Sequence, residues 1–233
     1  MFFSTLRARD AYAEPDPTFP TVAFPNPEEQ SGLKMAMARA EQEGVSLVLA
    51  NDPDADRLAV AERSEMGDWK AFSGDEIGVL LAHWQWRQHC EATGDDDAAN
   101  AGVTMLASTV SSSMLGAVAK AEGFCFEETL TGFKWMGRRS AEIRSGAEPH
   151  AVPFAYEEAI GYCVGAYSPC LHYILKGAKA SVNELLRDAG DLVKDKDGIS
   201  AAAVFYEMAA TLRREENISV AEVRPPFECC SDR

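Results

Sequence analysis

Three aspartates stand at alternate positions in one short segment, Asp52, Asp54 and Asp56. The segment lies between two short apolar runs, and Pro53 makes a helix unfavourable there, so we expect a tight loop in which the carboxylates converge. Crowded carboxylates repel one another unless a cation neutralises them. Oxygen ligands favour a hard ion such as Mg²⁺ or Ca²⁺. The spacing therefore predicts a metal-binding loop.

A calcium loop of the EF-hand type does not fit this segment. With Asp52 as position one, position six is Arg57 instead of glycine, and position twelve is Arg63 instead of glutamate. Mg²⁺ is therefore the expected ion, with water or a substrate phosphate completing its ligand set. Arg57 adds a fork-shaped cation that suits phosphate oxygens. The alternative is a solvated acidic turn capped by Arg57, and the spacing alone leaves it open.

Two further polar segments follow strands expected at 124–127 and 151–155. In parallel α/β sheets, ligands bind at the C-terminal ends of the strands. Paired carboxylates suit the hydroxyls of a sugar, a Thr-Gly pair lets the backbone approach a ligand, and a lysine could hold a phosphate. Ordinary helix capping by Thr131 and Glu157 is the alternative. The candidate residues are Thr131, Gly132, Lys134, Glu157 and Glu158.

A third charged segment, 194–198, precedes an Ala-rich stretch. Lys196 could serve as an acid/base or phosphate-binding group, and Asp197 could cap the helix that follows. A solvated charged turn is the alternative for this segment.

The elements that must position these residues follow from the apolar pattern. In the first part of the chain we expect a hairpin with its turn at Gly67, followed by a helix from 73 to about 90. The second part alternates strand and helix, which predicts a mainly parallel sheet with helices on both faces. The expected class is α/β, with two partial or complete α/β/α domains and mixed, mainly parallel sheets. The other expected elements are a helix at 34–43, strands at 46–50, 58–61, 69–72, 103–107, 124–127 and 151–155, and helices at 111–122, 132–145 and 198–214.

The net charge of the chain argues against two classes of partner, nucleic acids and anionic membranes. The chain has 233 residues, with 22 Lys and Arg against 37 Asp and Glu, a net charge of −15. Nucleic acid and anionic membranes need a basic surface, so neither is an expected partner. No apolar run reaches the roughly 20 residues of a membrane helix, and the six cysteines form no C-x-x-C pair. We expect a cytoplasmic protein, and the sequence does not predict its oligomeric state.

The segments that carry these candidate residues resemble a known family. They are similar to the alpha-D-phosphohexomutase superfamily, and the form with Pro53 and Ala55 resembles its eukaryotic phosphoglucomutase/phosphopentomutase branch. The likeness covers about 14–163 and 193–215. The segments that carry it are 16–29, 48–61, 72–75, 108–112, 126–137 and 157–162.

The resemblance implies an isomerase that moves phosphate between two positions of a hexose or pentose phosphate. In that family the transfer runs through a phosphoserine and a bisphosphorylated sugar, and it depends on Mg²⁺. The implied metal ligands are Asp52, Asp54 and Asp56, the implied substrate-binding residues are Thr131, Gly132, Glu157 and Glu158, and the implied catalytic residues are Arg57 and Lys196.

The resemblance also implies a domain layout. Residues 1–93 would be the C-terminal part of the family's second domain and 101–217 its third domain, with a linker at 94–100 between them. A segment at about 165–192 has no family counterpart, and 218–233 would be a tail. No serine of the chain stands in the family's catalytic serine motif, so we expect an incomplete fragment that is inactive alone.

Two features bear on the substrate and on the class of function. Ala159 stands where glucose-specific members carry serine, which favours the pentomutase-like branch. A non-catalytic Mg²⁺- or phosphosugar-binding module remains the alternative function. A phosphatase that uses Asp54 and Asp56 as an acid pair is disfavoured, because Leu58 occupies a position where that class requires threonine or valine.

Overall fold

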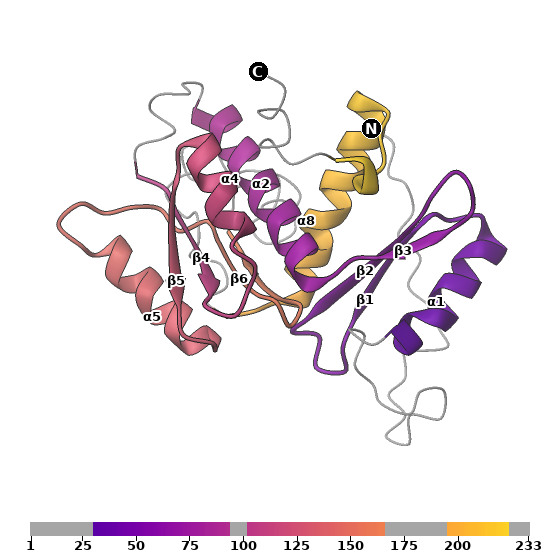
Figure 1. Cartoon of the computed structure of the whole chain (residues 1–233), viewed down its shortest axis with the longest axis horizontal. Coiled ribbons are helices and arrows are strands. Elements are labelled where there is room, and N and C mark those ends of the chain that lie inside the picture. The colour runs from indigo at the N-terminus through magenta and orange to yellow at the C-terminus, as the bar shows by residue number, and fades with distance from the viewer. Residues whose placement is uncertain (1–29, 94–101, 166–194, 224–233) are drawn as a thin grey trace, which may run out of the picture.

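The computed structural model describes residues 30–93, 102–165 and 195–223 (Figure 1). The linker expected at 94–100 lies outside the described residues, as do most of the segment expected at 165–192 and the end of the tail expected at 218–233. The described helices and strands are α1 (Gln30–Glu43), β1 (Leu47–Asn51), β2 (Leu58–Arg63), β3 (Trp69–Ala71), α2 (Gly74–Thr93), β4 (Thr104–Ser108), α4 (Met114–Glu122), β5 (Cys125–Thr129), α5 (Phe133–Arg144), β6 (Phe154–Glu157), β7 (Gly161–Val164), α8 (Gly198–Thr211), a π-helical turn (Leu212–Glu216) and a 3₁₀ helix (Val220–Glu222).

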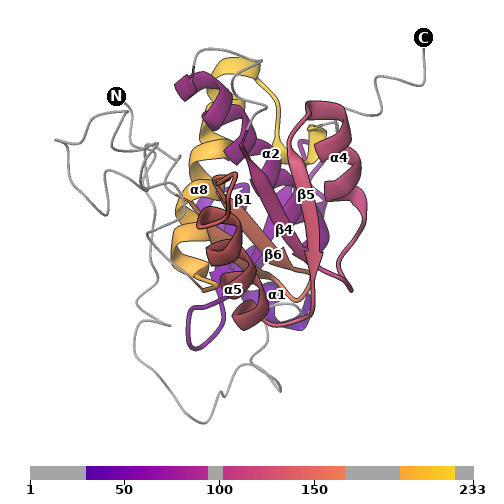
Figure 2. The ribbon, with the colours of Figure 1, turned by 90° about the vertical axis from the view of Figure 1, so that its left-hand side faces the viewer.

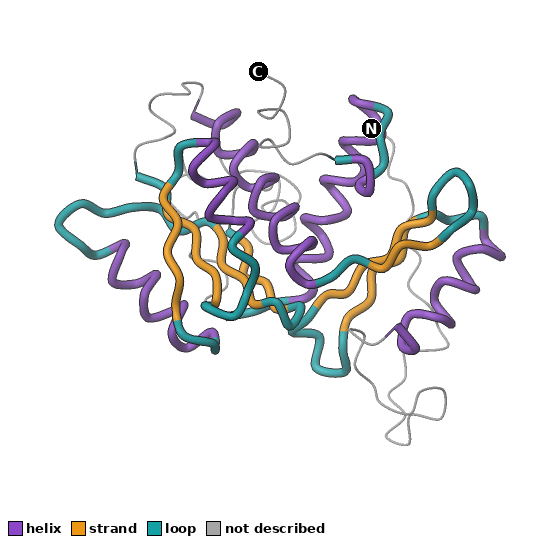
Figure 3. The backbone as a smooth tube through the Cα atoms, viewed as in Figure 1, coloured by secondary structure: helices purple, strands orange, loops and turns teal. Residues whose placement is uncertain are grey.

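The described strands form two sheets, which lie next to each other (Figure 3). The first has the order β1-β2-β3 and is antiparallel throughout, so the hairpin expected at Gly67 is confirmed. The second has the order β5-β4-β6-β7, with β4 parallel to both β5 and β6, and β7 antiparallel to β6. The expected α/β class with a mixed, mainly parallel sheet is confirmed by this second sheet.

Helices cover both faces of the second sheet. Along β4, Met105 and Ala107 belong to a large apolar core shared with α2 and α4, whereas Leu106 belongs to a smaller core shared with α5. Successive residues of a strand point to opposite faces, so α4 and α5 lie on opposite sides of the sheet, as Figure 2 shows. Helix α8 contacts β7 of the second sheet and also β1 and β2 of the first, and it therefore joins the two.

Local capping fixes where the helices begin and end. Ser73 and Glu76 form a reciprocal capping box at the start of α2, with the Ser73 amide donating to Glu76 Oε2 at 2.8 Å and the Glu76 amide donating to Ser73 Oγ at 3.2 Å. The predicted cap of α8 is confirmed, because Asp197 Oδ1 accepts a hydrogen bond from the Ile199 amide at 3.0 Å. Helix α4 ends at Gly123, which adopts the left-handed conformation.

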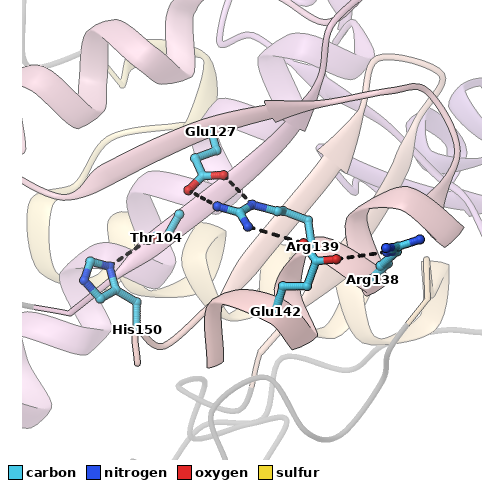
Figure 4. A network of polar contacts seen from close by, with 6 residues as sticks. All are labelled: Thr104, Glu127, Arg138, Arg139, Glu142 and His150. Atoms are coloured by element: carbon cyan, nitrogen blue, oxygen red, sulfur yellow. Dashed lines mark hydrogen bonds and ion pairs between the residues drawn. The ribbon is translucent and has the colours of Figure 1, made fainter. Parts of the chain in front are cut away.

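Helix α5 is attached to the edge strand β5 by a fork-shaped ion pair (Figure 4). Arg139 donates from Nε and Nη2 to the two carboxylate oxygens of Glu127 at 2.6 and 3.0 Å. Glu142 lies on the same helix face and binds both Arg139 and Arg138. This bidentate pair lies at the surface and adds to the packing of Phe133, Met136 and Ile143 of α5 against the sheet. Within the described ranges, no helix combines the length and the apolar character needed to cross a membrane.

Candidate functional site

The aspartate segment forms a tight turn between β1 and β2. The Ala55 amide donates to the Asp52 carbonyl at 3.0 Å, and Ala55 takes a positive φ of 61°. As a result, Asp52, Asp54 and Asp56 each offer a carboxylate oxygen within 4.8 Å of the others. The structure therefore brings together the three side chains that the spacing predicted would converge.

The electrostatics of this turn fit a cation. Asp56 Oδ1 is buried and accepts no hydrogen bond from any described residue, and Arg57 Nε is 3.8 Å away. Burial raises the pKa of the Asp52 carboxyl, the hydrogen bond from the Arg57 amide lowers it, and the neighbouring Asp54 and Asp56 raise it further. A buried acceptor without a donor and a carboxylate crowded by like charges are both stabilised by a hard divalent ion. The residues present thus fit Mg²⁺.

Arg57 lies at the edge of this turn and joins it to the second sheet. Its amide donates to Asp52 Oδ1 at 3.1 Å, and its Nε is 3.7 Å from Asp52 Oδ2. Its carbonyl accepts from Asn51 Nδ2 at 2.7 Å, and its backbone forms an isolated antiparallel bridge with Gly161. One-third of the Arg57 side chain is exposed, so the guanidinium is accessible from solvent.

Lys196 reaches the aspartate turn from the segment that precedes α8. Its Nζ is 2.7 Å from Asp56 Oδ2, and its side chain lies against Gly161, where an added Cβ would be 3.2 Å from Lys196 Cδ. Backbone hydrogen bonds hold the two residues that follow Lys196. The Asp197 amide donates to the Tyr162 carbonyl at 2.9 Å, and the Gly198 amide donates to the Ala55 carbonyl at 3.0 Å.

The Thr131–Gly132 loop and Glu157 also meet. The Gly132 amide donates a short hydrogen bond to Glu157 Oε1, and Gly132 takes a φ of 112°, which favours glycine. Thr131 is exposed. Thr131 and Glu157, the alternative helix caps, do not cap a helix with their side chains: the N-cap of α5 is Gly132, and Glu157 ends a strand. The loop therefore places the exposed Thr131 next to the glycine whose amide binds the Glu157 carboxylate.

Glu158 points elsewhere. Its Oε2 accepts hydrogen bonds from Ser108 Oγ at 2.9 Å and from Ser111 Oγ at 3.2 Å, at the end of β4. The structure thus separates the two adjacent glutamates, which the sequence had placed together as substrate ligands.

Several residues of this region were not identified from the sequence. The isolated bridge between Arg57 and Gly161 and the hydrogen bond from the Leu58 amide to the Ile160 carbonyl, 3.1 Å, join the aspartate turn to the β6–β7 turn. Two glycines pack closely in this region: a Cβ at Gly161 would lie 3.1 Å from Phe133 Cε2 and 3.2 Å from Lys196 Cδ, and a Cβ at Gly198 would overlap the Arg57 carbonyl. Their signal in the sequence is weak, since each is a single glycine next to a candidate residue.

The fold is that of the alpha-D-phosphohexomutase superfamily. The chain belongs to the phosphoglucomutase/phosphomannomutase family: the model of its alpha/beta/alpha domain II matches residues 2–67, and that of its alpha/beta/alpha domain III matches residues 73–225. The second match includes α2, which packs on β6. The domain limits expected at 93 and 101 stay a prediction.

Curated relatives are phosphosugar enzymes of eukaryotes. The chain is 45% identical to a phosphopentomutase of Mus musculus over 211 residues, which are 90% of this chain and 29% of that protein. It is 39% identical to a probable phosphoribomutase of Schizosaccharomyces pombe over 209 residues, 90% of this chain and 30% of that protein. It is 44% identical to a glucose 1,6-bisphosphate synthase of Mus musculus over 85% of this chain and 28% of that protein. The chain therefore spans less than a third of the length of these relatives.

Solved structures share the fold. A putative phosphomannomutase of Thermus thermophilus superposes with a TM-score of 0.57 at 17% identity, covering 89% of this chain and 35% of that chain. A phosphoglucomutase/phosphomannomutase family protein of Burkholderia thailandensis gives 0.52 at 16% identity, covering 89% and 33%.

Proposed function

We propose that this chain forms the metal-binding and sugar-binding part of a phosphosugar mutase, an isomerase that moves a phosphoryl group between two positions of a pentose or hexose phosphate. The observation that carries the proposal is the meeting of the aspartate turn, Lys196 and the Glu157 loop around Gly161. The names of the relatives, phosphopentomutase and phosphoribomutase, agree with it. The resemblance to the family implies that the transfer runs through a phosphoserine and a bisphosphorylated sugar.

Each group of residues has a separate role in this proposal. Asp52, Asp54 and Asp56 would hold Mg²⁺, which when bound polarises phosphoryl oxygens and offsets their charge. Arg57 binds phosphate oxygens beside that site through its guanidinium. Lys196 lies between the aspartate turn and Gly161 and holds or moves a proton at Nζ close to the reacting oxygen.

The sugar contacts come from the other side of Gly161. Glu157 accepts hydrogen bonds from sugar hydroxyls through the oxygen that Gly132 does not occupy, and Thr131 donates from its exposed hydroxyl. Ala159 has no hydroxyl to reach a further sugar oxygen, so we propose a pentose phosphate as the preferred substrate. We also propose that the protein acts in the cytoplasm.

Calorimetric titration of the full chain tests the binding part of the proposal. MgCl₂ should bind the wild-type chain, and Asp54→Asn should weaken this binding by more than about tenfold. Asp54 is the best probe because Asp52 and Asp56 also hold Arg57 and Lys196. Asp68→Asn, on the exposed β2–β3 turn, is the matched control and should change nothing. Equal Mg²⁺ affinity of Asp54→Asn and wild type would refute the metal site.

Sugar binding and turnover need separate measurements. Ribose 5-phosphate should bind the wild-type chain and bind Glu157→Gln more weakly. Conversion of ribose 1-phosphate to ribose 5-phosphate by the chain would establish an enzyme. Binding of both ligands without conversion is the result expected of a part of a mutase that is inactive alone, and it also agrees with the alternative, a non-catalytic Mg²⁺- or phosphosugar-binding module. Absence of any binding of ribose 5-phosphate or glucose 6-phosphate would refute the sugar-binding part of the proposal.

A further inference from the structure

The turn between β6 and β7 has a strained backbone. Glu157 pairs with Gly161, so the three residues 158–160 make the turn. The last of them, Ile160, takes a φ of 53°, a region that β-branched residues avoid. Three-residue hairpin turns need this conformation at that position and usually have glycine there. A strained residue persists only where its surroundings hold it, so other contacts must hold this turn.

Glu158 provides the polar contacts of the turn. Its carboxylate accepts from Ser108 Oγ and Ser111 Oγ, and its amide donates to Ser111 Oγ at 3.1 Å. The two serine hydroxyls are also 2.7 Å apart. Three oxygens therefore share two hydroxyl protons, which makes a closed network between the turn and the end of β4.

The start of α2 closes the other side of this network. A Cβ at Gly74 would overlap the Glu158 carbonyl oxygen, so the helix start packs directly on the turn. Asp75 Oδ1 accepts from the Ser112 amide at 2.7 Å and from the Tyr156 hydroxyl at 3.1 Å. The β4–α4 loop is thus held at two neighbouring residues: Glu158 binds Ser111, and Asp75 binds the Ser112 amide. A movement of the loop would break both sets of hydrogen bonds.

The same turn touches both halves of the proposed site. On one side Glu157 binds the Gly132 amide. On the other side the Ile160 carbonyl accepts from the Leu58 amide, and Gly161 bridges to Arg57 beside the aspartates. A shift of the turn would therefore move the Glu157 carboxylate relative to the sugar loop and to the aspartate turn at the same time.

We propose that Glu158 is a positioning residue that does not contact the sugar, and that its hydrogen bonds to Ser108 and Ser111 hold the strained turn so that Glu157 faces Gly132. Holding the turn in this way should tighten the binding of a sugar phosphate, and this part of the inference rests on the proposed function. The structural part of the inference, the link from Glu158 to the Gly132 amide, can be measured without any ligand.

The experiment compares Glu158→Ala, Glu158→Gln and the double variant Ser108→Ala/Ser111→Ala in the full chain. Amide hydrogen exchange at Gly132, followed by NMR, reports the bond to Glu157. Val48→Ala, at a buried position of β1 that is far from the turn in sequence, serves as the control for a general loss of stability. Affinity for ribose 5-phosphate is measured on the same samples by calorimetry.

We expect Glu158→Ala and the double serine variant each to speed exchange at Gly132 by about tenfold more than Val48→Ala does, and to weaken ribose 5-phosphate binding by a similar factor. Adding Glu158→Ala to the serine variant should change little, because both remove the same network. Glu158→Gln should restore most of the protection, since its carbonyl oxygen still accepts from a serine.

Other results would overturn the proposal. If Glu158 contacts the sugar, Glu158→Gln and Glu158→Ala will weaken binding equally, the serine variant will bind normally, and exchange at Gly132 will match the Val48→Ala control. If wild type binds no sugar phosphate, the proposed function fails, yet exchange at Gly132 still decides whether Glu158 positions Glu157. Unchanged exchange at Gly132 in Glu158→Ala refutes the positioning role in either case.

Discussion

Substitution of Gly198 by alanine should separate the start of α8 from the aspartate turn. The backbone of Gly198 is in a conformation that any residue adopts, so the change acts only through the added methyl group. A Cβ there would lie 2.7 Å from the Arg57 carbonyl carbon and closer still to the carbonyl oxygen and to Asn51 Nδ2. Ordinary contact begins at 3.4 Å, so the helix start must move by about 1 Å.

The magnitude follows from what this movement disturbs. Overpacking of this kind costs about 1–3 kcal/mol. The hydrogen bonds from Gly198 to Ala55, 3.0 Å, and from Asn51 to Arg57, 2.7 Å, would each lose about 1 kcal/mol. Alanine regains about 1 kcal/mol of helix propensity. The net loss in free energy of unfolding should be about 2–4 kcal/mol, and the Lys196–Asp56 ion pair should lengthen.

Urea unfolding measures the loss in free energy of unfolding, and Mg²⁺ calorimetry reports the change at the Lys196–Asp56 ion pair. With a slope of about 2 kcal/mol per molar urea, the midpoint should fall by about 1–2 M, and Mg²⁺ affinity should change with it. Gly146→Ala is the matched control, because a Cβ there meets only carbonyl oxygens at 3.4 and 3.5 Å, which is ordinary contact. A Gly198→Ala variant as stable as Gly146→Ala would refute the close packing on which the argument depends.

Three further predictions concern separate parts of the chain. Glu62→Ala should lower the free energy of unfolding by about 2–4 kcal/mol in urea, because this buried carboxylate accepts hydrogen bonds from two amides at the start of the 3₁₀ helix, one of them that of Val220; a loss below about 0.5 kcal/mol would contradict this. Burial lowers the pKa of His83 below its unfolded value of 6.5, so the stability from keeping it neutral is complete above pH 6.5 and is lost as the pH falls through the folded value. Urea unfolding at about pH 7.5 and about pH 5.5 should therefore show a larger loss for wild type than for His83→Gln, and equal losses would count against it. Burial raises the pKa of the Cys163 thiol to about 12, so iodoacetamide should modify the exposed Cys125 and spare Cys163 in peptide mapping by mass spectrometry, and equal labelling would show the burial argument to be wrong.

Local patterns predicted most elements but missed β7. Its four residues follow a turn whose left-handed position is Ile160, so the sequence lacks the glycine or asparagine that signals such a turn. The helix expected from 111 begins only at Met114, because Ser111 and the Ser112 amide are engaged by Glu158 and Asp75. In both places long-range hydrogen bonds override the local preference.

In the candidate site, too, local features were predicted and long-range contacts were not. The alternating aspartates predicted a converging turn because their spacing is local. The ion pair between Lys196 and Asp56 joins residues far apart in the sequence, and only the resemblance to the family had implied that both belong to the site. The opposite directions of Glu157 and Glu158 were not predicted, because the strand was expected to end at 155 and both glutamates were placed in the loop after it, whereas β6 extends to Glu157.

Helix α8 contacts both sheets, although it is the last α-helix of the described residues. During synthesis, β1 and β2 emerge well before the helix that covers them, so their apolar surface stays uncovered until α8 has been made. The link between the two sheets therefore has a high contact order, which predicts slow folding and a period in which the nascent chain is prone to aggregate. Production of the protein should accordingly depend on chaperones and temperature more strongly than its final stability would suggest.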